Sequence, residues 1–237
     1  MKTDLFITTF GRKELFEKSL DSLLANTDRD QFNLTIVVDG GSVKESSLKS
    51  FECADTILWS KNNLGLGPSI NSALAHISTS NNYFDNNKNP YICMVQDDVL
   101  YSPDWLEKLI RVHRAYSKVK KIGFASGHDA PEHPRRGEIK FGQDVLYLKD
   151  WIRATNMLAE REYFLSMMPI PRIDPETGRE RGKPNNGMGS SCDWHFIRNN
   201  SNSVCKTGRT NIVYPGLIKH IGFDQSTWLD RPLPENK

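Results

Sequence analysis

The chain has 237 residues, of which 38% are hydrophobic and 25% are charged, and its formal net charge is +2. A chain of this size can bury a full core, and it fits one α/β domain with elaborations better than two independent domains. The small net charge does not by itself indicate nucleic-acid binding. The sequence contains no run of 18 apolar residues, the length typical of a membrane-spanning helix, so no such helix is predicted.

The cysteines and the N-terminus bear on the compartment. Cys53, Cys93, Cys192 and Cys205 show neither CxxC pairing nor the spacing of a zinc site, so we expect reduced thiols. The first residues enter a strand-like run without the basic region and long apolar stretch of a secretory signal. These features predict a cytoplasmic protein.

The first half of the chain alternates strand and helix patterns. In chain order we expect a strand at residues 5–9, a helix at 13–25, strands at 34–38 and 56–59, a helix at 69–77, a strand at 91–95, a helix at 103–116 and a strand at 122–126. Such alternation predicts a mostly parallel sheet with helices on both faces.

The second half is less regular. Residues 169–186 are rich in Pro, Gly and charge, which predicts a long loop, and we expect this loop to act as a lid that orders when a ligand is bound. Two basic clusters, at residues 133–136 and 179–183, are expected to be solvated loops.

The most informative stretch contains two adjacent acids. Asp97 and Asp98 follow the apolar strand at 91–95, and a helix start is predicted directly after them, with Ser102 as N-cap and Pro103 as the first helical residue. Ligands of open α/β sheets bind at the carboxyl ends of the strands, where two carboxylates repel each other unless a cation or a sugar lies between them. A solvated loop before a helix is the alternative explanation.

Two other strands end in turn residues. The run Thr8-Thr9-Phe10-Gly11-Arg12 leaves backbone N–H groups able to meet a base or a phosphate. Asp39 follows a buried strand and precedes two glycines. Each is explained alone by ordinary turn chemistry, but together on neighbouring strands they suit a nucleotide cleft.

A glycine-punctuated loop at residues 62–71 contains Asn63, Gly65 and Asn71. It lacks both the Lys-Ser/Thr of a P-loop and the full GxGxxG spacing. Near the C-terminus, Asp193 opens an amphipathic segment and His220 ends a strand-like run. A lone histidine of this kind is more often structural than a metal ligand.

Taken together, these motifs resemble those of inverting GT-A fold nucleotide-sugar glycosyltransferases. The runs TTFGR and VVDGGS resemble the first two strand ends of glycosyltransferase family 2, and QDDV followed by SPDWL is similar to the metal motif of N-acetylglucosaminyltransferase I type enzymes. The resemblance extends from Thr8 to Gly222. It implies a Rossmann-like, mostly parallel sheet in a single domain, with a nucleotide-sugar-binding half at 1–126 and a less regular acceptor-binding and catalytic half at 127–237.

The resemblance also implies roles for individual residues. Asp98 and His220 would bind Mn²⁺ or Mg²⁺, and Asp193 would be the catalytic base. The donor, a UDP-sugar first of all, would meet the remaining site residues: Thr8, Thr9, Gly11, Arg12, Asp39, Asn63, Gly65, Asn71 and Asp97. Two positions depart from the family pattern, because Gln96 and Cys192 stand where an acid is common.

The sequence therefore predicts metal-dependent transfer of a sugar, with inversion, to a hydroxyl acceptor. The carboxylate would take the acceptor proton and the cation would stabilise the leaving diphosphate. A glycan is the expected acceptor, and a modified DNA base remains an alternative because of the basic clusters near Arg135 and Arg181. A nucleotidyltransferase and a non-catalytic nucleotide-sugar-binding protein are the alternative functions.

Overall fold

The computed structural model describes residues 2–40, 51–80, 89–173, 195 and 209–222. Asp193, most of the predicted lid at 169–186 and the basic cluster at 179–183 lie outside the described residues, so the predictions made for them are not tested here. None of the helices in the described part is long and apolar enough to span a membrane.

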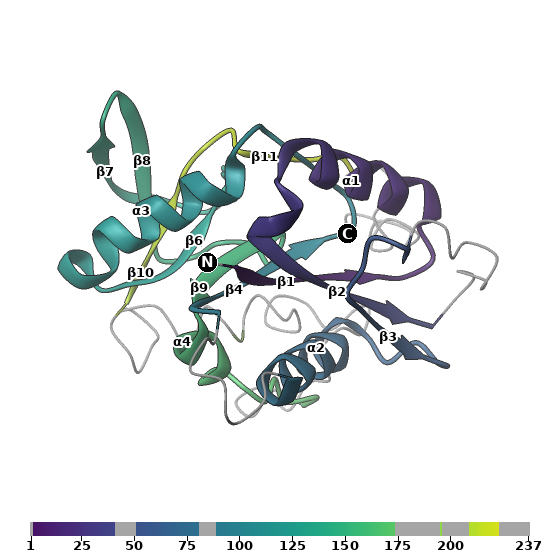
Figure 1. The fold of residues 1–237 in the computed structure, drawn as a ribbon. Coiled ribbons are helices and arrows are strands. Elements are labelled where there is room, and N and C mark those ends of the chain that lie inside the picture. Colours follow the sequence, from purple (N-terminus) through teal and green to yellow (C-terminus); the bar gives the residue numbers. More distant parts are fainter. Residues whose placement is uncertain (1, 41–50, 81–88, 174–194, 196–208, 223–237) are drawn as a thin grey trace, which may run out of the picture.

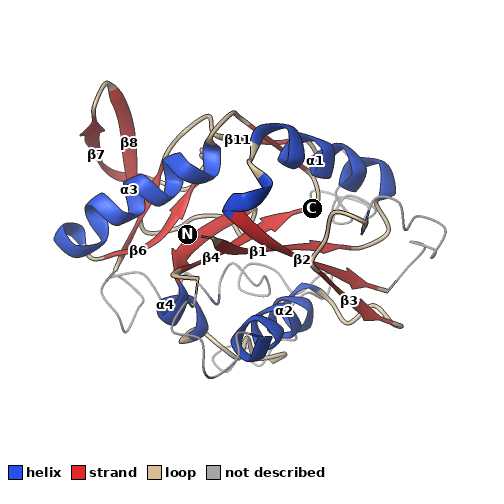
Figure 2. Ribbon diagram, viewed as in Figure 1, coloured by secondary structure: helices blue, strands red, loops and turns tan. Residues whose placement is uncertain are grey.

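The described chain forms a nine-stranded sheet with helices on both faces (Figures 1 and 2). The first elements are β1 (Thr3–Thr9), α1 (Lys13–Asn26), β2 (Phe32–Asp39), β3 (Thr56–Ser60), α2 (Leu66–Ser80), β4 (Tyr91–Gln96), β5 (Val99–Tyr101), α3 (Trp105–Lys120) and β6 (Ile122–Ser126). They are followed by β7 (Arg135–Phe141), β8 (Asp144–Lys149), β9 (Asn156–Glu160), α4 (Arg161–Leu165), β10 (Thr210–Val213) and β11 (Ile218–His220).

The strand order is β3-β2-β1-β4-β9-β6-β10-β8-β7. The first four strands pair in parallel, as the alternation of strands and helices predicts. Among the strands of this sheet, β9 and β8 run against the direction of the others. The mostly parallel sheet is thus confirmed, and the carboxyl ends of β1, β2, β4 and β6 lie at one edge.

Two apolar layers cover the sheet, one on each face. In β1, Leu5 and Ile7 pack in the layer formed with α1 and α3, whereas Phe6 packs in the layer formed with α2 and α4. This alternation follows from the two-residue period of a strand, and β1 is buried throughout and apolar at residues 5–7 because both faces are covered. Figure 1 shows α1 and α3 on one side of the sheet and α2 and α4 on the other.

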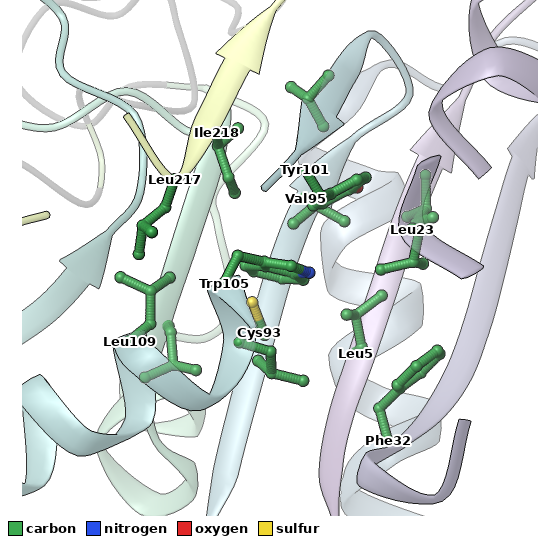
Figure 3. Close-up of a cluster of buried hydrophobic side chains, with 14 of the residues drawn as sticks. Leu5, Leu23, Phe32, Cys93, Val95, Tyr101, Trp105, Leu109, Leu217 and Ile218 are labelled. Carbon is green, nitrogen blue, oxygen red and sulfur yellow. The ribbon is translucent and has the colours of Figure 1, made fainter. Parts of the chain in front are cut away.

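Trp105 is the largest side chain in the α1–α3 layer (Figure 3). It is fully buried near Cys93 and Tyr101, and its indole N–H donates to Thr27 Oγ1 at 2.7 Å. Indole N–H groups buried in a core need such a partner. The first residue of α3 therefore anchors that helix to the sheet.

The predicted start of α3 is wrong by two residues. The helix begins at Trp105 after Asp104, whose φ is +58°, and neither Ser102 nor Pro103 is helical. Ser102 N–H instead donates to Leu217 O and its hydroxyl donates to Gly216 O, so the segment after Asp98 is extended and pairs with the C-terminal strand β11. A long-range pairing has overridden the local capping signal.

The prediction of a solvated loop for the basic cluster at residues 133–136 is only partly correct. Arg135 and Arg136 are exposed, as expected, but they begin β7, which forms a hairpin with β8 that projects at one end of the sheet (Figure 1). Their guanidinium groups pair with Asp129 and Asp150. Strand pairing and these ion pairs hold a segment whose composition predicts a loop.

Candidate active site

Asp97 and Asp98 form the centre of the site, at the carboxyl end of β4. Their side chains are only 2% and 4% exposed. Thr9, at the end of the neighbouring strand β1, donates its hydroxyl to Asp97 Oδ2 at 2.7 Å. Thr9 and the two acids lie close together because parallel pairing of β1 and β4 brings their ends to one edge.

Arg12 bridges the two acids from the loop between β1 and α1. Its Nη1 donates to Asp98 Oδ2 at 2.6 Å and its Nη2 donates to Asp97 Oδ1. The Arg12 side chain is 21% exposed, so the ion pairs are largely shielded from water. The sequence predicted Arg12 as a donor-binding residue and gave no sign that it contacts both carboxylates.

The surroundings of the two acids shift their pKa values in opposite directions. Burial raises the pKa of Asp97 to about 6, opposed by Arg12 and reinforced by the charge of Asp98. Burial would raise the pKa of Asp98 as well, but the hydrogen bond from His220 and the charge of Arg12 together lower it. Asp98 is therefore the stronger acid of the pair, and at neutral pH both side chains are mostly carboxylates.

His220 reaches this edge from the C-terminal segment. Strand β11 pairs antiparallel with β5, with His220 opposite Val99, and His220 Nε2 lies 3.2 Å from Asp98 Oδ2. Ile221 N–H donates to the backbone oxygen of Asp98 at 2.8 Å. The predicted proximity of Asp98 and His220 is thus present, although 122 residues separate them in the sequence.

Gly222 packs directly against Asp98. A Cβ on this glycine would lie 2.6 Å from Asp98 Cβ and 2.7 Å from Asp98 Cγ, closer than real contacts. Backbone without a side chain is needed there for the C-terminal segment to approach the acid. Gly222 is therefore a structural part of the site that the sequence did not single out.

The chemistry of these side chains suits a divalent cation that also binds a substrate. Asp98 Oδ1 is buried, and no described residue donates a hydrogen bond to it. The 3.2 Å between His220 Nε2 and Asp98 Oδ2 is close to the roughly 3 Å expected for adjacent ligands of an octahedral ion. Among the described residues no group of three or more acidic, histidine or cysteine side chains could hold an ion alone. Mg²⁺-type ions commonly complete their shell with water and substrate phosphates.

Asp39 organises the glycine-punctuated loop that precedes α2. Its Oδ1 accepts from Leu64 N–H at 2.7 Å and its Oδ2 accepts from Gly65 N–H at 2.8 Å. Asn63 Oδ1 also accepts from Gly65 N–H, at 3.0 Å. Three residues that the sequence assigned to donor binding are thus brought together, and Asp39 holds the loop with both of its oxygens.

The other residues predicted to bind the sugar donor lie in different environments. Thr8 is buried in β1, and Gly11 lies in the following turn with a φ of +68°. Asn71, on α2, bonds through both ends of its side-chain amide to the backbone of Ile170. The structure therefore places Asn71 as an anchor for the segment after α4 and not among the two acids.

His128 lies near the site, and the sequence analysis did not identify it as a candidate site residue. It follows β6, and its ring centroid lies 6.1 Å from that of His220. Burial lowers the pKa of His128, and the neighbouring His220 lowers it further. Asn156 Oδ1 accepts from Gly127 N–H at 2.8 Å and so holds this turn. The rule that ligands gather at the carboxyl ends of parallel strands could have identified His128.

Solved structures share this fold. The 1-349 form of S. aureus TarS matches with a TM-score of 0.55 and 11% identity, covering 92% of this chain and 58% of that one. A mannosyltransferase from Pyrobaculum calidifontis, PcManGT, in complex with GDP-Man and Mn²⁺, matches with a TM-score of 0.51 and 14% identity, covering 73% of this chain and 48% of that one. The chain thus spans about half the length of these structures, and it has the GT-A fold.

The sequence defines the family as well. The model of glycosyl transferase family 2 matches residues 4–202, which include β1, both acids and most of the sheet. The chain therefore belongs to glycosyl transferase family 2. No curated protein matches the sequence.

Proposed function

We propose that this protein transfers a sugar from a nucleoside-diphosphate donor to a hydroxyl acceptor with the help of a divalent cation. Membership of glycosyl transferase family 2 supports the reaction class. A UDP-sugar is the donor that the sequence motifs favour, and the comparison structure of PcManGT is a complex with GDP-Man and Mn²⁺.

The observation that carries the proposal is the buried pair of acids with His220 beside it. Asp98 and His220 would hold Mn²⁺ or Mg²⁺, and Asp98 Oδ1, which has no hydrogen-bond partner among the described residues, supports this role. The bound cation would stabilise the negative charge that develops on the leaving diphosphate. Asp97, which is bonded to Thr9 and Arg12, would contact the ribose or the transferred sugar.

The donor would lie along the carboxyl edge of β1, β2 and β4. In this arrangement Thr8, Thr9 and Gly11 line the base, and Asp39 contacts the base or ribose, besides holding Asn63 and Gly65 in place. Parallel pairing of β1 with β2 and β4 supports the arrangement, since it puts these strand ends side by side. Asn71 completes the list of proposed donor residues.

A substitution at Asp98 tests the proposal. Donor hydrolysis and transfer are measured over a panel of nucleotide sugars with and without Mn²⁺, for the wild type, for Asp98→Asn and for Asp104→Asn. Asp104 is an exposed acid six residues away whose left-handed backbone suits asparagine, so it is the matched control. We expect Asp98→Asn to lose Mn²⁺-dependent activity by about 100-fold or more while the protein remains folded, as judged by circular dichroism.

The outcomes separate the alternative functions. Donor binding without hydrolysis or transfer to any acceptor would indicate a nucleotide-sugar-binding protein. Release of pyrophosphate from a nucleoside triphosphate and a sugar phosphate would indicate a nucleotidyltransferase. Wild-type Mn²⁺ dependence in Asp98→Asn would refute the assigned metal ligand.

The proposed base is Asp193, from its match to the base position of the family motif. A carboxylate there would remove the acceptor proton in a single displacement, which inverts the anomeric centre without an enzyme nucleophile. We expect Asp193→Asn to keep donor affinity while transfer falls by roughly 100-fold or more. Binding of donor by calorimetry and NMR of the product's anomeric centre are the measurements, and a retained configuration would contradict the assignment.

The acceptor and the compartment are proposed on sequence grounds. A glycan hydroxyl is the favoured acceptor and a modified DNA base the alternative, and transfer of a radiolabelled sugar to glycan or duplex DNA distinguishes them. A cytoplasmic location rests on the expected reduced thiols. Thiol titration of the protein purified without reductant checks this, because disulfides would argue for an oxidising compartment.

A further inference from the structure

Arg12 occupies the position of a counter-ion between the two acids of the proposed metal site. Its guanidinium contacts both carboxylates, and the Asp98 oxygen that it binds is the same one that lies 3.2 Å from His220. The two carboxylates carry little exposed surface, so their charges are compensated mainly by this one cation. A divalent ion at Asp98 would compete with Arg12 for the same negative charge.

The location of Arg12 gives it a second partner when a donor binds. It immediately precedes α1, a helix of 14 residues, whose N-terminal end carries a partial positive charge that favours anions. A guanidinium binds phosphate in the same two-pronged way as it binds carboxylate. The diphosphate of a nucleotide donor could therefore bind Arg12 in place of Asp97 and Asp98.

We propose that Arg12 competes with the divalent cation for the carboxylate pair. In the free protein Arg12 occupies both carboxylates, and the donor diphosphate releases it from them. Metal binding then depends on the nucleotide: each ligand strengthens the binding of the other by the same factor, as linkage requires. This inference rests on the proposed function, because it takes Asp98 and His220 as the cation ligands.

The test measures binding of Mn²⁺ alone, from the electron paramagnetic resonance signal of the free ion. Wild type is compared with Arg12→Gln, Arg12→Lys and Lys13→Gln. Lys13 is the matched control because it is adjacent, 55% exposed, and paired with Glu17 instead of with the acids. We expect Arg12→Gln to bind Mn²⁺ about tenfold more tightly than wild type, within the usual range of coupling between sites, and Lys13→Gln to match wild type.

A double variant and the Arg12→Lys variant make the result specific. Adding Asp98→Asn to Arg12→Gln should abolish the gained affinity, which places the ion at Asp98. Arg12→Lys keeps the charge but cannot span both carboxylates, so we expect a smaller gain, and this variant decides the matter if Arg12→Gln does not fold. Circular dichroism establishes which variants are folded.

The competing outcomes are distinct. Unchanged or weaker Mn²⁺ binding in the folded Arg12 variants would overturn the inference, as would an equal gain in Lys13→Gln, which would reveal a general charge effect. Wild-type sugar transfer with no gain in Arg12→Gln would leave the proposed function standing and remove Arg12's role. A clear gain in Arg12→Gln without any sugar transfer by wild type would keep the role of Arg12 and refute the proposed reaction.

Discussion

At the scale of single residues, the site depends on one position that has no side chain. Gly222 touches the Asp98 carboxylate closely enough that even one methyl group has no room. The clash would be with an acid that is itself held by Arg12 and His220, so the acid cannot move without losing those partners. Gly222 therefore controls the position of Asp98.

This leads to a prediction for Gly222→Ala. We expect Asp98 to be displaced, so that Mn²⁺-dependent donor binding falls by at least about tenfold while the sheet remains folded. Calorimetric titration with UDP and Mn²⁺ measures the loss. The control is Gly137→Ala on β7, where an added Cβ meets nothing within 4 Å, and equal behaviour of the two variants would contradict the prediction.

A second residue-scale feature is the buried ammonium of Lys149. Its side chain is 1% exposed, and Nζ pairs with Asp129 and donates to Ala130 O at 2.6 Å. Burial alone would raise the pKa of Asp129, but Lys149 and Arg135 lower it below its usual value. A carboxylate whose pKa is lowered in the folded state stabilises the fold where it is ionised, and loses that effect on protonation.

We therefore expect Asp129→Asn to lower the free energy of unfolding at pH 7 by about 2 kcal/mol, as for a hydrogen bond to a charged group. The difference in free energy of unfolding between the variant and the wild type should be largest above the unfolded-state pKa of about 3.9. It should shrink as the pH falls through the lower, folded-state pKa. Urea unfolding between pH 7 and pH 3 measures it. Asp30→Asn, at an exposed acid, is the control, and a pH-independent difference would contradict this explanation.

At the scale of elements, the short strand β11 links the C-terminal segment to the acids. It pairs with β5, directly after Asp98, and so positions His220. The strand has only three residues, and pairing with a similarly short partner gives little stability alone. Leu217 and Ile218 are buried in the α1–α3 layer and supply the packing that holds it (Figure 3).

If His220 acts at the metal and the phosphates, its loss should depend on the ligand. We expect His220→Ala, in the presence of Mn²⁺, to weaken UDP binding by about tenfold or more and to leave uridine binding unchanged. Calorimetry with the two ligands measures this, and His76→Ala on α2 is the control. Equal loss for UDP and uridine would indicate that His220 is structural.

The same elements explain where sequence-based prediction succeeded. The strands β1, β2, β3, β4 and β6 and helices α1 and α2 were predicted close to their observed bounds. Their apolar residues recur with the period of the element, which can be recognised without knowing the partner that each element packs against. Asp97, Asp98, Thr9 and Asp39 could be placed at one edge because parallel strands align their ends.

At the scale of the whole molecule, the features that could not be predicted come from distant parts of the chain. The strands β5, β7, β8, β9 and β10 were not assigned, and several strands pair over long separations, such as β4 with β9 and β5 with β11. The contact of Arg12 with both acids, and that of Gly222 with Asp98, also join segments more than 80 residues apart. Local patterns carry no information about such contacts.

The origin of the site in two remote segments has a consequence for synthesis in the cell. Asp98 and His220 leave the ribosome 122 residues apart, which at about 5–20 residues per second is a delay of roughly 6–24 seconds. During that interval the strands β1 to β4 can already pair, but the nascent chain lacks His220 and Gly222. In the growing polypeptide Arg12 is therefore available to pair with the two acids before His220 is. The described side chains of the proposed metal site are complete only after β11 has been made.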